Sequence, residues 1–513
     1  MSSSTAFSLR TFIASFADLR RLPRAFWFVI GAFVCESMAY FGVLTLMVPY
    51  LSGGLGWGDQ WASVTVSIFT GLVTLFMLGI GSWAEKFGLR RALLFALLIS
   101  TVGRAFYSYA AAIGPGWIVP TVVIGSLVIV AIGSSILTPV AYSGVKQYTD
   151  ARTNSMGYGM IYALMNLGIV VIGGLSSWIR PAVQSLKDNP PPASAGDSGL
   201  RWLARFSTSG VDAVNWVCTG ITLLTFAGFL LLMTKRAEAQ KVRPDPADQP
   251  HSGPRLPLGA RLKVFFTEGP FSNARFIFFI FMLLPVRTLF AHQWLTMPEY
   301  ILRAYPDTVA GYTPWMGQLA HWLHGSVPWV AGPFLWLADR KVADLMEWLV
   351  NWINPAIIFF GVPVFTALTQ RHNVYKMMVI GSLVSALPTF LLCWGPDLNL
   401  LVIYFVIFSI GEALWSARFL EYAAELAPPG RVAQYMGLAQ IPWLLAKSTT
   451  GFYSGWLLGK FCPAGTPVAN LHTGRLWFIY GCIAMISPIG LWLARKWVLA
   501  GWHTKPASET ASG

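Results

Sequence analysis

Two acidic residues that could bind a cation or carry a proton lie deep inside apolar stretches of this sequence. Glu412 falls within residues 403–415, and Glu36 lies in the first apolar stretch. A charge at the centre of a bilayer costs about 2.5–3.5 kcal/mol even on lenient insertion scales, so each is a candidate functional group. A buried Glu412 carboxylate must pair with a cation or be protonated. The alternatives are a static ion pair of Glu412 with Lys447 or Arg418, and a structural hydrogen bond between helices for Glu36.

Four cations, Arg418 among them, and one histidine also lie within apolar stretches. Lys447 could neutralise Glu412 or bind an anionic group of a substrate, and Arg104 and Arg287 are open to the same two interpretations. His292 titrates near neutral pH, so it could respond to a proton gradient. A lone histidine is more often a hydrogen-bonded core residue, and that alternative stays open.

These groups must be positioned by membrane spans. The sequence has 513 residues, of which 55% are hydrophobic and 11% are charged, whereas soluble domains carry about 25% charged residues. A helix needs about 20 mainly apolar residues to cross the hydrocarbon core. We therefore predict an all-α membrane protein with twelve transmembrane helices in two six-helix halves. The predicted spans are 25–50, 61–83, 92–113, 116–143, 156–179, 212–234, 273–300, 352–370, 376–395, 399–425, 432–459 and 474–497.

The lysines and arginines predict how these helices are oriented. Most of the 36 lie in connections that would all face the cytoplasm if the N-terminus does, so the positive-inside rule predicts that both termini are cytoplasmic. Residues 235–270 are polar and rich in proline, which is typical of a flexible linker. The expected parts are an N-terminal segment 1–24, an N-terminal half 25–234, a linker 235–270, a C-terminal half 271–498 and a tail 499–513.

Two connections on the predicted outer side are long. Residues 180–211, with a triple proline and several Ser and Gly, predict an ordinary extracellular loop. Residues 304–348 are rich in tryptophan and partly amphipathic. They predict an extracellular loop with interfacial helical turns, and the alternative is a hairpin that dips into the bilayer.

Composition and motifs argue against several classes of function. The net charge of +14 could suggest a nucleic-acid partner, but the basic residues are spread over short connections and form no single face. The five cysteines lack metal-ligand spacing, so neither a metal site nor a disulfide framework is expected. A phosphate-binding loop and the common hydrolase motifs are missing. We therefore expect neither an enzyme nor a cofactor, and a proton gradient is the expected energy source.

The connection between the second and third predicted spans, residues 81–91, carries an acid, three bases and two glycines. It resembles the signature of the major facilitator superfamily, Gly-x-Leu-Ala-Asp-Arg-x-Gly-Arg-Arg, with Trp83 and Glu85 replacing the leucine and the aspartate. The glycines permit a tight turn. The resemblance implies the two-half fold of that superfamily and a conformational loop. The residues of this loop are Gly81, Glu85, Gly88, Arg90 and Arg91.

Three further segments resemble the proton-dependent oligopeptide transporter family. Aligning Tyr40 with the first-helix motif Glu-x-x-Glu-Arg-Phe-x-Tyr-Tyr-Gly places the second glutamate on Glu36. Tyr162 and Asn166 match the fifth-helix motif Phe-Tyr-x-x-Ile-Asn-x-Gly. Glu412 matches the acid of the tenth-helix motif Gly-Glu-x-x-x-Ser-Pro. The resemblance therefore extends over both predicted halves.

Several charges of that family are missing. The first glutamate and the arginine of the first-helix motif fall on Phe33 and Ser37, the fourth-helix lysine falls on Thr138, and the seventh-helix acid falls on His292. In the family, these first- and fourth-helix charges join proton movement to binding of the peptide carboxylate, while the tenth-helix glutamate faces the peptide amino group. The resemblance thus implies a substrate with an amine and a weak need for a free carboxylate.

The predicted function is proton-coupled uptake of a small peptide or amine-bearing solute by alternating access. The expected proton-coupling residues are Glu36 and His292, and the expected substrate-binding residues are Glu412, Tyr40, Tyr162, Asn166 and Lys447. The alternatives are a proton-antiport exporter of drug-like or metabolite cations and a receptor that does not transport. The expected partners are the lipid bilayer and a small-molecule substrate, without nucleic acid. We expect a monomer in a bacterial cytoplasmic membrane.

Overall fold

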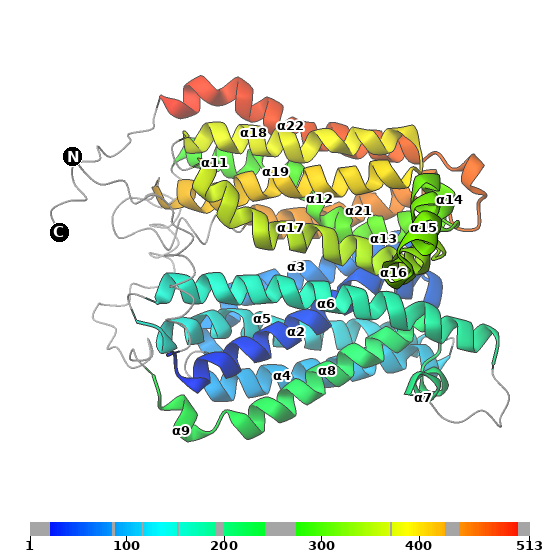
Figure 1. Cartoon of the computed structure of the whole chain (residues 1–513). Coiled ribbons are helices and arrows are strands. Elements are labelled where there is room, and N and C mark those ends of the chain that lie inside the picture. Colours follow the sequence, from blue (N-terminus) through cyan, green and yellow to red (C-terminus); the bar gives the residue numbers. More distant parts are fainter. Residues whose placement is uncertain are drawn as a thin grey trace.

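The named secondary-structure elements of the described residues are all helices. This structure, a computed structural model, describes residues 21–84, 88–114, 116–150, 153–190, 199–241, 273–369, 372–425 and 441–500. Long helices run side by side in two groups, from α2 to α8 and from α11 to α22 (Figure 1). The prediction of an all-α protein is confirmed for these ranges.

The N-terminal group follows the predicted spans closely. Its long helices are α2 (Arg24–Pro49), α3 (Gly58–Ala84), α4 (Leu89–Tyr109), α5 (Ile118–Tyr148), α6 (Asn154–Asp188) and α8 (Gly210–Leu232). Two short helices, α7 (Gly199–Phe206) and α9 (Lys235–Glu238), flank α8. Ser209 caps α8, because its hydroxyl accepts a hydrogen bond of 3.1 Å from the backbone N–H of Asp212.

The predicted loop over residues 180–211 is wrong in part. The helix α6 continues through Pro181 to Asp188, and α7 follows within the same region. Side chains hold the extra turns of α6 in place: Arg180 forms an ion pair with Glu347, and Gln184 accepts a hydrogen bond of 3.0 Å from the backbone N–H of Gly210. Such tertiary contacts are not visible in local sequence.

The C-terminal group combines long helices with several short ones. They are α11 (Ala274–Met282), α12 (Leu284–Leu295), α13 (Met297–Ala304), α17 (Met346–Thr369), α18 (Val374–Ala386), α19 (Leu398–Glu425), α21 (Ile441–Phe461) and α22 (Thr473–Leu499). The predicted span 273–300 is divided into three, because Pro285 and Pro298 stand in the first turns of α12 and α13. Proline lacks the N–H for an interior helical bond and disfavours helix at the preceding residue.

The tryptophan-rich segment 304–348 forms helical turns, as predicted. It contains α14 (Val309–Tyr312), α15 (Pro314–Ser326) and α16 (Pro328–Ala338), which lie together at one end of the molecule (Figure 1). Two backbone hydrogen bonds close its base: Val309 N–H donates to the Arg340 carbonyl at 2.8 Å, and Val342 N–H donates to the Asp307 carbonyl at 3.0 Å.

Eleven described helices are long and apolar enough to cross a membrane. The remaining predicted span, 432–459, falls on α21, where the polar run from Lys447 to Thr450 lowers the hydropathy. Residues 426–440 of that prediction lie outside the described part. Twelve spans and cytoplasmic termini therefore stay predictions.

The two groups of helices pack through α3 against α21 and α6 against α17. Glycines permit the first contact: a Cβ atom added at Gly451 would lie 2.2 Å from the Ser63 carbonyl oxygen, and one at Gly455 would lie 2.4 Å from the Asp59 carbonyl oxygen. The Gly451 N–H also donates to the Ser67 hydroxyl at 2.8 Å. Small residues four apart let membrane helices approach closely.

Candidate transport site

Glu36 forms a buried ion pair within the N-terminal half. Both carboxylate oxygens accept hydrogen bonds from the guanidinium of Arg104, at 2.6 and 2.7 Å, and the two side chains are 3% and 1% exposed. Arg104 also donates to the Thr222 hydroxyl at 2.5 Å. The pair therefore joins α2, α4 and α8, and the bidentate geometry is the strong form of this interaction.

The cation missing from the first-helix motif is thus supplied from α4. Ser37 stands where the family has arginine, and its hydroxyl donates to the Phe33 carbonyl at 2.7 Å within its own helix. Tyr40 lies one turn after Glu36 and lines a void of about 10 Å³ together with Arg104 and Tyr107. Arg104 is consequently engaged by Glu36 in this conformation.

Glu412 lies in the C-terminal half without a cation. Its carboxylate accepts a hydrogen bond of 2.7 Å from the side-chain amide of Asn354, which also donates to the Ser409 hydroxyl at 3.0 Å. No salt bridge to Glu412 forms among the described side chains, Lys447 included. The Arg418 side chain lies outside the described part. The acid on α19 is therefore oriented by an amide from α17 and has no cation among the described side chains.

Lys447 and Arg287 lie against aromatic rings. The Lys447 ammonium is 5.4 Å from the centre of the Trp443 ring, and the Arg287 guanidinium carbon is 5.3 Å from the same ring. Neither cation has a salt bridge to a described acid. The structure therefore places two cations of the C-terminal half around one indole.

His292 is fully buried and hydrogen-bonded to hydroxyl groups. Its Nδ1 lies 2.9 Å from the Thr296 hydroxyl and its Nε2 lies 3.4 Å from the Tyr453 hydroxyl. Its ring stacks on Tyr480 with a centroid distance of 3.8 Å. This environment matches the hydrogen-bonded core histidine that the sequence left open, although it leaves the predicted proton-coupling role untested.

Tyr162 and Asn166 lie on α6 and do not contact Glu412 by any described hydrogen bond. The Asn166 amide donates to the Tyr162 carbonyl at 2.9 Å, so it is satisfied within its own helix. The Tyr162 side chain is 40% exposed. The structure thus places these predicted substrate-binding residues in the opposite half from Glu412.

The conformational loop is described only in part. Gly88 adopts a φ of +78° at the start of α4, a conformation that favours glycine. The backbone N–H of Arg90 donates to the Glu238 carboxylate at 3.1 Å, and the Arg90 guanidinium donates to the Met233 carbonyl. Arg91 is exposed. Glu85 and the Gly81 environment lie outside the described part.

Contacts between the halves cluster near α13, and we call this region the closed end. Arg303 of α13 binds Asp59 of α3 through two hydrogen bonds of 2.5 and 2.7 Å, and it also pairs with Glu299 at 2.8 Å. The Ser52 hydroxyl donates to Glu299 at 3.1 Å. On the other side of the interface, Arg180 of α6 pairs with Glu347 of α17 and donates to the Ala343 carbonyl at 2.6 Å.

The sequence analysis missed these residues. Asp59, Arg180, Glu299, Arg303 and Glu347 all lie at span ends that the positive-inside rule assigns to the outer side. Acids and bases of both halves meet at that one level. Their shared position at the predicted outer ends of the spans is the feature of the sequence that could have identified them.

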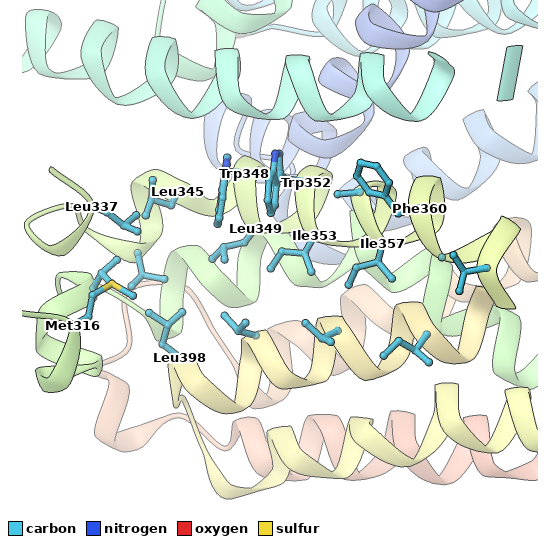
Figure 2. Close-up of a pocket in the computed structure, with 18 of the residues that line it drawn as sticks. Met316, Leu337, Leu345, Trp348, Leu349, Trp352, Ile353, Ile357, Phe360 and Leu398 are labelled. Carbon is cyan, nitrogen blue, oxygen red and sulfur yellow. The ribbon is translucent and has the colours of Figure 1, made fainter. Parts of the chain in front are cut away.

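An apolar groove of about 780 Å³ runs along α17 and α19 (Figure 2). Figure 2 shows Leu349, Ile353 and Ile357 of α17 between the two helices, with Leu398 of α19 at one end. Neither Asn354 nor Glu412 lines it. A groove without polar groups suits hydrocarbon, so we do not assign it to a charged solute.

Comparisons with known proteins match this arrangement. The family profile described as Major Facilitator Superfamily matches residues 28–343. Peptide transporter family 1 of Drosophila melanogaster is 26% identical over 175 residues, covering 32% of this chain and 23% of that protein. Protein NRT1/ PTR FAMILY 5.15 of Arabidopsis thaliana is 29% identical over 115 residues, 20% of each chain. The matches thus span less than a quarter of these relatives.

Solved structures share the fold over nearly the whole chain. A bacterial homologue of the human drug peptide transporters PepT1 and PepT2 aligns with a TM-score of 0.63 and 16% identity, covering 93% of this chain and 98% of that chain. The nucleoside transporter NupG aligns with a TM-score of 0.60 and 12% identity, covering 91% and 99%. At these identities the likeness establishes the fold, and it bears out the fold implied by residues 81–91.

Proposed function

We propose that this chain, which belongs to the major facilitator superfamily, is a secondary active transporter that takes up a small peptide or another amine-bearing solute with protons. The observation that carries the proposal is Glu412, a carboxylate within a membrane span that is held by the Asn354 amide at 2.7 Å and has no described cation. An ionised acid in that setting gains most from a cationic ligand. The names of the peptide transporter relatives support the same class of solute.

In this proposal the two halves move against each other. The contacts of the closed end join the halves at one level, and the positive-inside rule would place that level outside the cell. Uptake requires that these contacts break and that others form at the opposite end, so that the solute meets each side in turn.

Proton coupling is assigned to Glu36, with His292 as a second candidate. Protonation of Glu36 would release the Arg104 guanidinium from its bidentate contact. Such a proton can drive transport only if its affinity differs between the outward and inward conformations. Breaking and re-forming the Glu36–Arg104 pair is one means by which that affinity could change.

The test uses full-length protein in liposomes with an imposed inward proton gradient. Internal pH is followed while a pool of dipeptides is offered to the wild type, to Glu412→Gln and to the exposed control Asp339→Asn. We expect peptide-dependent acidification in the wild type and control, and its loss in Glu412→Gln. Equal acidification in Glu412→Gln would overturn the role of Glu412, and no acidification in folded wild type would exclude dipeptides as the solute.

A further inference from the structure

The guanidinium of Arg287 is buried without an acceptor. Its side chain is 1% exposed, and its Nε and Nη1 atoms have no hydrogen-bond partner among the residues that the structure describes. Three aromatic rings surround it, with the guanidinium carbon 5.5 Å from the Trp415 ring centre, 4.2 Å from Phe419 and 5.3 Å from Trp443. Buried charges in folded proteins are normally paired or hydrogen-bonded. Arg287 is therefore an exception that needs an explanation.

The aromatic rings do not by themselves satisfy this cation. A ring face attracts a cation but offers no lone pair to its N–H groups. The contrast with the other buried arginine is direct: Arg104, also 1% exposed, donates to both oxygens of Glu36. The described side chains provide a carboxylate for one buried arginine and none for the other, so Arg287 is a candidate to bind an external anion.

A second cation shares the same indole. The Lys447 ammonium lies 5.4 Å from the Trp443 ring centre, and the two residues are one helical turn apart on α21. Lys447 is half-buried. Arg287 on α12 and Lys447 on α21 therefore both approach Trp443, and no described salt bridge neutralises either one.

This cluster adjoins the proposed amine site. Trp415, which contacts Arg287, lies three residues after Glu412 on α19, although Trp415 donates to Ser385 of α18 at 3.2 Å while Glu412 accepts from Asn354 of α17. Phe290, one turn after Arg287, contacts Trp415 and Trp443 with ring-centre distances of 5.9 and 5.4 Å. One half of the protein thus presents an acid and, beside it, two cations.

We propose that Arg287, Lys447 and Trp443 form a binding subsite for a carboxylate group, which takes the place of the cations missing at Ser37 and Thr138. The inference rests on the proposed function in one respect, that the carboxylate belongs to a solute whose amine binds Glu412. A free small carboxylate would meet the same groups. The expected solute of this subsite is therefore a zwitterion, whereas the family resemblance implied a weak need for a carboxylate.

The experiment compares matched probes on purified full-length protein. Thermal unfolding is followed with dialanine, with dialanine amide, which lacks the carboxylate, and with sodium acetate, all at equal ionic strength. We expect the apparent affinity for dialanine to exceed that for its amide by about 10- to 100-fold, the range of a hydrogen bond to a charged group. The difference should vanish in Arg287→Met and shrink in Lys447→Met.

A matched control separates the subsite from a general loss of charge. Lys460 lies 4.8 Å from the Trp456 ring centre on the same helix, with the same spacing in sequence as Lys447 and Trp443. Lys460→Met should leave the preference for dialanine unchanged. Because Arg287→Met removes an unpaired buried charge, it should unfold without ligand at the same or a higher temperature than wild type.

Each outcome is decisive. Equal affinity for dialanine and its amide in wild type, with no acetate response, would overturn the subsite. A preference that survives both Arg287→Met and Lys447→Met would also overturn it. Stabilisation by acetate alone, lost in Arg287→Met, would support the subsite with a free anion as ligand while contradicting peptide transport. Silence toward all three probes would contradict both proposals.

Discussion

At the scale of single residues, the most constrained charge is the Glu36–Arg104 pair. Each partner is nearly inaccessible to solvent, and the two are bound at 2.6 and 2.7 Å. Arg104→Met would leave the carboxylate buried without its cation, so we expect it to lower the free energy of unfolding by about 3–5 kcal/mol. The double variant Glu36→Gln with Arg104→Met removes both charges and should recover most of that loss. Thermal unfolding in detergent measures both effects.

The double variant also tests the proposed coupling role. If Glu36 carries the coupling proton, protein that lacks both charges should still bind the solute and exchange it across liposomes, yet show no solute-dependent proton flux. Unchanged proton flux in that variant would exclude Glu36 and leave His292 as the candidate.

The sequence identified which residues are charged inside the spans, but it could not assign their partners. Arg104 is 68 residues from Glu36, and Arg287, Lys447 and Arg104 look equivalent in their local apolar surroundings. Helix packing alone decides that one of them meets a carboxylate and the other two meet Trp443. A static pair of Glu412 with Lys447 was one alternative that hydropathy left open, and the structure instead provides an amide from Asn354.

At the scale of elements, the α3–α21 contact depends on the lack of side chains at two glycines. We expect Gly451→Ala to weaken the contact by about 1–3 kcal/mol through overpacking, since its Cβ would meet the Ser63 carbonyl oxygen at 2.2 Å. Gly459→Ala on the same helix is the control, because its Cβ would lie 3.7 Å from the nearest atom. The unfolding temperature of Gly451→Ala should therefore be lower than that of Gly459→Ala. Equal unfolding temperatures would show that α3 and α21 can move apart freely.

Helix boundaries were predictable where the end of an apolar run coincided with a helix-breaking residue. Span length located most helices, while the breaks at Pro285 and Pro298 needed closer attention to helix-breaking residues within an apolar run. The extension of α6 was not predictable, because it depends on Glu347, which is 167 residues away from Arg180. The polar run in α21 lowers the hydropathy of a helix that the predicted span 432–459 nevertheless located, and the close approach to α3 explains why small and polar residues suffice there.

At the scale of the whole molecule, the two halves are held together by charge at one level. The single side chain of Arg303 contacts three groups: Asp59, Glu299 and the Cys462 carbonyl, the last at 2.9 Å. Arginine suits this position because its planar donors can serve several acceptors at once. The sequence predicted two halves and an outer level, whereas the identity of the residues that join them depends on how the halves meet.

Breaking the Arg303 contacts should therefore change the fraction of molecules in which the closed end is open. Arg303→Gln leaves Asp59 and Glu299 facing each other without their cation, so we expect the closed end to open in a fraction of molecules at least 10-fold larger than in wild type, equivalent to about 1.4 kcal/mol. Genetically encoded spin labels at Asp188 and Lys341, which line one cleft at this end, report the distance between the halves and leave the five native cysteines in place. Wild type should give one short distance and Arg303→Gln an additional longer one. Arg275→Gln, which removes a 3.1 Å contact with the Trp497 carbonyl away from the closed end, should give the wild-type distribution. A single short distance in all three proteins would mean that these ion pairs do not control opening.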